Sequence, residues 1–104
     1  MLNKFDQQQF ILIQQNINEY ESQKPSLDSL MALTQSIEKR LDSLKSIDNT
    51  WKEAFRTEWW ELEFTSSLMI DNEKENLTKE DEEAVSTALN NMKTMINEAL
   101  FNQA

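Results

Sequence analysis

Residues 51–63 read Trp-Lys-Glu-Ala-Phe-Arg-Thr-Glu-Trp-Trp-Glu-Leu-Glu, which places three tryptophans within ten positions. The apolar side chains recur at helical spacing in two adjacent stripes, one of Trp51, Phe55, Trp59 and Leu62, the other of Trp60, Phe64 and Leu68. Thr50 and Glu53 have the spacing of a capping box, so we expect a helix over 51–72. The wide apolar arc predicts that this helix is the centre of the core.

Three further segments carry the same periodicity and predict helices over 3–23, 26–46 and 79–101. Pro25 separates the first two, and the Thr78–Asp81 spacing predicts a capping box at the start of the last. The main apolar positions of these segments are Phe10, Ile13, Ile17, Leu30, Leu33, Ile37, Leu41, Val85, Leu89, Met92 and Ile96. Short connections favour antiparallel neighbours, so the chain is predicted to be all-α, a single-domain, up-down four-helix bundle over residues 1–104.

The residue types that support most site chemistry are missing. The 104 residues include no glycine, no cysteine and no histidine. There is therefore no imidazole for proton transfer, no soft metal ligand and no glycine-rich phosphate loop. Glu58 and Glu61 are i, i+3 neighbours, but nothing in the sequence indicates the dry pocket that would raise the pKa of one carboxyl group. We expect no enzyme activity, no catalytic residue, no metal site and no cofactor.

Charge is the main guide to partners. The net charge is −9, and residues 71–83 hold seven acidic against two basic residues, a net −5. Such a surface repels nucleic acid and anionic membranes and attracts a basic protein. The chain shows no signal peptide and no long apolar run, so we expect a cytoplasmic protein.

The candidate partner-binding residues combine aromatic and acidic side chains, as interface hot spots often do. Trp59 and Trp60 point about 100° apart on a helix, so both cannot face the core. One of them is expected at the edge of the core beside Glu58 and Glu61. The predicted binding residues are Glu58, Trp59, Glu61, Asp71, Glu73, Glu75, Glu80 and Glu83.

Three segments carry a resemblance to a known family: Pro25-Ser26-Leu27-Asp28-Ser29-Leu30, the run 51–63, and Leu77-Thr78-Lys79-Glu80-Asp81. From Pro25 onward the chain resembles small helical bacterial immunity proteins of contact-dependent growth inhibition and related polymorphic toxin systems. The resemblance implies a cytosolic protein that binds one cognate toxin domain and blocks it. Some such proteins are paired with RNA-cleaving toxins, including EndoU-like ribonucleases. A nuclease is basic where RNA binds, so an acidic protein is complementary to that surface. We expect the free protein to be a monomer.

Two other functions remain open from the sequence. An acidic mimic of nucleic acid, of the kind phages use, would need carboxylates spread along an elongated face. Here they concentrate near one end of the expected bundle. A homo-oligomeric structural module would use the broad apolar stripe of the 51–72 helix to form a dimer.

Overall fold

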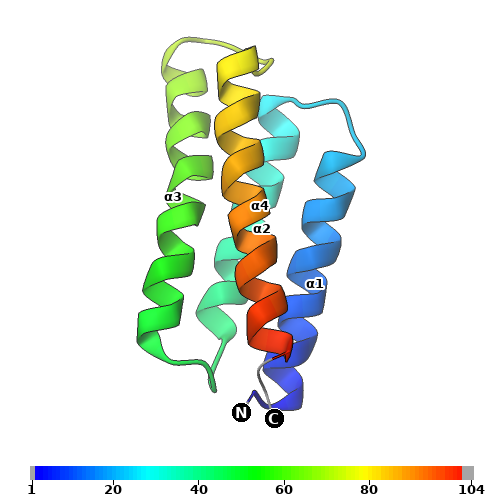
Figure 1. The fold of residues 1–104 in the computed structure, drawn as a ribbon. Helices are drawn as coiled ribbons and strands as arrows, with labels where there is room; N and C mark the ends of the chain where they lie inside the picture. The colour runs from blue at the N-terminus through cyan, green and yellow to red at the C-terminus, as the bar shows by residue number, and fades with distance from the viewer. Residues whose placement is uncertain (1, 102–104) are drawn as a thin grey trace.

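The computed structural model describes residues 2–101, which form four α-helices and no strand. The helices are α1 (Lys4–Glu21), α2 (Leu27–Ser43), α3 (Asn49–Asp71) and α4 (Lys79–Phe101). They run alternately up and down, and each packs against its two neighbours in a ring (Figure 1). The predicted all-α four-helix bundle is confirmed.

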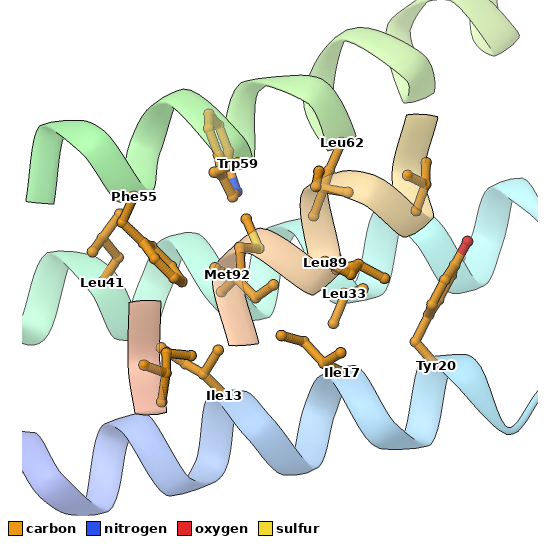
Figure 2. Close-up of a cluster of buried hydrophobic side chains, with 14 of the residues drawn as sticks. Ile13, Ile17, Tyr20, Leu33, Leu41, Phe55, Trp59, Leu62, Leu89 and Met92 are labelled. Carbon is orange, nitrogen blue, oxygen red and sulfur yellow. The ribbon is translucent and has the colours of Figure 1, made fainter. Parts of the chain in front are cut away.

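The core is formed by one apolar stripe from each helix, because side chains three and four residues apart share a face (Figure 2). Each fully buried Leu, Ile or Phe contributes about 1.5–3 kcal/mol relative to an exposed position. Fully buried side chains include Phe10, Ile13 and Ile17 of α1; Leu30, Ile37 and Leu41 of α2; Phe55 and Leu62 of α3; and Leu89, Met92 and Ile96 of α4.

The prediction that the helix over 51–72 forms the centre of the core is wrong in one respect. Trp51, Phe55, Trp59 and Leu62 do pack inward, but the second stripe of α3 faces solvent. Helix α3 contacts α2 and α4 and occupies one corner of the ring, as every other helix does. A corner helix buries only one side, so its wide apolar arc leaves side chains uncovered.

Polar side chains cap the helix starts. The predicted capping box of α4 is confirmed, since Asp81 N donates to Thr78 Oγ1 and Thr78 N donates to the Asp81 carboxylate, both at 3.1 Å. The predicted cap at Thr50 is wrong. Helix α3 begins two residues earlier, and Asp48 accepts a 2.7 Å hydrogen bond from Trp51 N. An aspartate at the N-cap also favours the positive end of the helix dipole.

A buried carboxylate ends α2 earlier than predicted. Helix α2 stops at Ser43 instead of 46, and Leu44 takes an extended backbone. The amides of Lys45 and Ser46 and the Ser46 hydroxyl all donate to the fully buried carboxylate of Asp6 in α1. This carboxylate therefore ties the 44–48 loop to α1 across the base of the bundle.

Candidate functional site

Four of the predicted binding residues meet in one groove between α3 and α4. Glu58 and Glu61 line it from α3, and Glu80 and Glu83 line it from α4. The floor on the α4 side is made of the small side chains Ala84, Thr87 and Ala88, which leave a hollow of about 420 Å³. We call this hollow the acidic groove. Its four carboxylates come from segments about twenty residues apart, which the antiparallel turn brings side by side.

The carboxylates of the acidic groove form no ion pair in the part of the chain that the structure describes. The ion pairs among residues 2–101 are Arg56–Asp42 and Lys93–Glu21, and neither includes a groove residue. Glu58 accepts one exposed hydrogen bond of 3.2 Å from the side-chain amide of Asn91. Four like charges in one shallow hollow repel one another, so a cation placed there is favoured.

The other three predicted acids lie at the end of α3 and outside the groove. Asp71, Glu73 and Glu75 are exposed, and none of them lines the acidic groove. Two hydrogen bonds, from Glu73 N to Ile70 O and from Lys74 N to Met69 O, close α3 in a Schellman motif. Glu73 takes the left-handed conformation, with φ 54°, at the position that glycine usually fills.

The backbone of the 72–78 link is also anchored. Leu27 N, at the start of α2, donates to Glu75 O at 2.8 Å. This bond holds the acidic link against the top of the neighbouring helix pair, so its carboxylates extend the negative charge beyond the groove.

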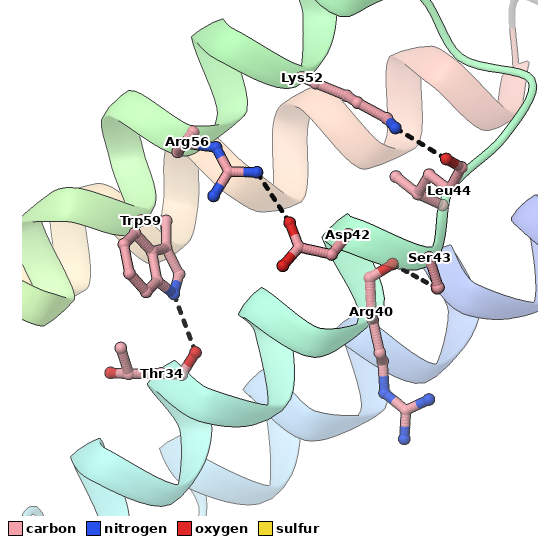
Figure 3. Close-up of polar contacts among 8 residues, drawn as sticks. All are labelled: Thr34, Arg40, Asp42, Ser43, Leu44, Lys52, Arg56 and Trp59. Carbon is pink, nitrogen blue, oxygen red and sulfur yellow. Dashed lines mark hydrogen bonds and ion pairs between the residues drawn. The ribbon is translucent and has the colours of Figure 1, made fainter.

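Trp59 does not lie where the binding prediction needs it. Its side chain is 5% exposed, and its indole Nε1 donates to Thr34 O of α2 at 2.8 Å (Figure 3). A tryptophan whose polar atom is bonded inside the core is a packing residue. As an exposed anchor, Trp59 is therefore the wrong member of the pair.

Trp60 takes the exposed position instead, at 56% exposure. Phe64 and Leu68 continue its line along α3, at 60% and 43%. We call these three side chains the apolar ridge. The i, i+4, i+8 spacing is visible in the sequence, where it predicts a second stripe of the core or, for a homo-oligomeric module, a dimer surface.

The opposite flank of α3 is closed by polar contacts with α2. Arg56 pairs with Asp42 at 2.9 Å, and Lys52 donates to Leu44 O at 2.7 Å (Figure 3). The basic side chains of α3 thus face α2, while its groove-lining acids face α4. This separation leaves no basic residue of α3 in the acidic groove.

Two titratable groups with shifted pKa values lie outside the groove. Burial alone would raise the pKa of Asp6, but hydrogen bonds from Ser46 and Lys45, with the charge of Lys52, lower it below 3.8. Burial raises the pKa of Tyr20, and the carboxylates of Glu82 and Glu21 add to the rise. Asp6 therefore stays ionised and Tyr20 protonated at neutral pH.

No family model matches this chain, and no curated protein or solved structure matches it either. None of the four helices, as described, has the length and apolarity needed to cross a bilayer.

Proposed function

We propose that this chain is an immunity protein, which binds a cognate toxin domain and occludes its substrate surface. The proposed toxin is a basic, RNA-cleaving nuclease. In this proposal the protein acts in the bacterial cytoplasm, is a monomer when free and has no catalytic role of its own. The sequence resemblance from Pro25 onward motivates the class of function.

One observation carries the proposal: Glu58, Glu61, Glu80 and Glu83 line a single groove and form no ion pair with any residue between 2 and 101. A surface that binds RNA presents Lys and Arg side chains for phosphates. The same side chains fit a groove lined by carboxylates. Such complementarity raises the association rate by roughly 10–10³-fold. The gain falls as salt screens the charges.

The first test is protection and complex formation. The full chain would be co-expressed with the toxin domain encoded directly upstream of its gene, and the purified mixture run on a gel-filtration column. We expect restored growth and a one-to-one complex. Neither protection nor a complex would end the proposal.

The second test asks whether the groove carries the binding. Glu58→Lys, Glu61→Lys and Glu83→Lys are combined; Glu80 is kept because the N-terminus of α4 favours its charge. We expect association with the toxin to slow by about tenfold or more at low salt. The matched control reverses Glu19 of α1, Glu38 of α2 and Glu98 near the C-terminal end of α4, none of which lines the acidic groove, and it changes the net charge equally. Equal losses in both triple variants would assign the effect to overall charge and contradict a groove-based mechanism.

A further inference from the structure

The apolar ridge is left without a partner inside the bundle. Trp60, Phe64 and Leu68 stand on the outward side of α3, between the flank that contacts α2 and the flank that lines the acidic groove. Their spacing covers about 12 Å along the helix axis, given a rise of 1.5 Å per residue. Three large apolar side chains in a line expose more contiguous apolar surface than scattered single residues do.

The exposed indole is held in place from behind. The rings of Trp59 and Trp60 meet edge to face, with centroids 5.1 Å apart and an interplanar angle of 67°. Trp59 is itself fixed by its hydrogen bond to Thr34 O. A side chain already restrained before binding loses less conformational entropy when a partner covers it. The side chain of Trp60 is thus pre-organised to act as an anchor for a binding partner.

The ridge and the acidic groove form one continuous surface. Leu68 lines a hollow at the top of α3 and α4 together with Glu80, Asp81, Lys74 and Lys79, and Glu80 also lines the acidic groove. Glu61 belongs to the groove and lies three residues before Phe64, one turn away on the same helix. A partner that covers the ridge therefore meets carboxylates where the ridge borders the acidic groove, and side chains of both charges beside Leu68.

We propose that the apolar ridge is the docking site for a basic amphipathic helix of the partner. Its apolar side chains pack on Trp60, Phe64 and Leu68, while its Lys and Arg side chains reach the acidic groove. Residues at i, i+4 and i+8 form the type of ridge that packs against another helix at a crossing angle of about −50°. The identity of the partner rests on the proposed function, whereas the surface can be tested without the toxin.

Charge makes a second copy of this chain a poorer occupant of the apolar ridge than a basic helix. A self-association through α3 would bring together two ridges that are each bordered by Glu61 and by the rest of the acidic groove. Each copy also carries a net charge of −9. Like charges placed opposite one another at an interface oppose association. A cationic helix has the opposite effect at every one of these positions.

The probe is a synthetic amphipathic helix of Leu and Lys, about 18 residues long. Two matched peptides replace every Leu by Ser or every Lys by Glu. Titration calorimetry would measure their binding to the full-length protein. We expect the Leu/Lys peptide to bind at least about tenfold more tightly than either matched peptide. Equal binding of the Ser/Lys peptide would mean that charge alone is recognised and would overturn the proposal.

The protein variant Trp60→Ala with Phe64→Ala should weaken binding of the Leu/Lys peptide by about tenfold or more. Both side chains are exposed, so the fold should remain, as a melting curve would verify. The matched control is Ile11→Ala, an apolar residue of α1 that is 46% exposed; its affinity should stay within about twofold of the unaltered protein. An unchanged affinity in the double variant would overturn the proposal.

Two further readouts separate the competing outcomes. If sedimentation finds a dimer that the Trp60→Ala, Phe64→Ala variant dissolves, the ridge is a self-association surface and the proposal is wrong. If the toxin is captured equally by this variant and by the unaltered protein, the ridge proposal fails while the immunity function stands. If the peptide binds through the ridge but the toxin is never captured, the docking surface stands and the proposed function fails.

Discussion

The two flanks of α3 are built from side chains of opposite charge. Toward α2, Lys52 and Arg56 are bonded to Leu44 O and Asp42, and Trp59 to Thr34 O. Toward α4, Glu58 and Glu61 face Glu80 and Glu83 with no ion pair among the residues described. The polar groups of the first flank form hydrogen bonds and an ion pair within the bundle. The second flank leaves its carboxylates free to bind another molecule. Substitutions on the α2 flank should therefore change stability, and substitutions on the α4 flank should change binding.

The largest expected effect comes from the two adjacent tryptophans. Trp59→Ala should lower the free energy of unfolding by about 3–5 kcal/mol, because it leaves a cavity and removes the hydrogen bond from the indole to Thr34 O. Trp60→Ala should change it by less than about 0.5 kcal/mol, since that ring is mostly exposed. Urea denaturation of both variants makes the comparison. Similar losses in the two would contradict the assignment of Trp59 to the core and Trp60 to the surface.

The contacts of Asp6, which join α1 to the loop between α2 and α3, can be tested by pH. Because its pKa is lowered on folding, the carboxylate adds stability above the unfolded value of 3.8, and this gain is lost as pH falls through the lower folded pKa. Asp6→Asn should cost about 2–3 kcal/mol at neutral pH and flatten the pH dependence in the acid range. Urea titrations from neutral to acid pH measure this, with the exposed Asp71→Asn as control. A variant that keeps the full acid dependence would show that other groups cause it.

The link between α3 and α4 contains a strained backbone position. Glu73 is in the left-handed region, which disfavours residues with a Cβ. Glu73→Gly should raise the free energy of unfolding by about 0.5–1 kcal/mol, after the entropy cost of glycine in the unfolded chain. Glu73→Ala removes the same charge but keeps the Cβ, so it should give no such gain. Equal stabilities of the two variants would assign the effect to charge.

The smallest effect concerns the groove itself. Glu58→Gln, Glu61→Gln and Glu83→Gln together should raise the melting temperature at low salt by roughly 1–3 °C, because like-charge repulsion is relieved. The difference should vanish at high salt, where the repulsion is screened in the unaltered protein as well. Thermal melts at the two ionic strengths measure it. A lower melting temperature at both salts would mean that these carboxylates stabilise the bundle.

Apolar periodicity was enough to predict the four helices and their antiparallel order. It could not decide between Trp59 and Trp60, since both are apolar and adjacent, and each belongs to one of the two stripes of a wide apolar arc. The choice depends on Thr34 O, a backbone atom 25 residues away. The cap of α3 failed for a similar reason: Asp48 and Thr50 are both good N-cap residues, and the path of the preceding loop selects one.

The hydrogen-bond donors to Asp6 could not be predicted from the sequence pattern either. An aspartate in the first turn of a helix is expected to face the helix dipole. Its actual donors lie 39 and 40 residues later, in a loop whose conformation exists only once α1 and α2 have packed. The acidic groove, by contrast, was partly predictable, because a short link between two helices places the end of one beside the start of the next.

The placement of the chain ends has a practical consequence. Helix α1 begins and α4 ends at the base of the bundle, beside the 44–48 loop, while the 72–78 link lies at the far end (Figure 1). An affinity tag or a fluorescent fusion joined before α1 or after α4 would start from the base, at the opposite end of the bundle from the 72–78 link. The protein can accordingly be immobilised on a biosensor chip by its base, with the carboxylate-lined hollow turned toward the flowing analyte.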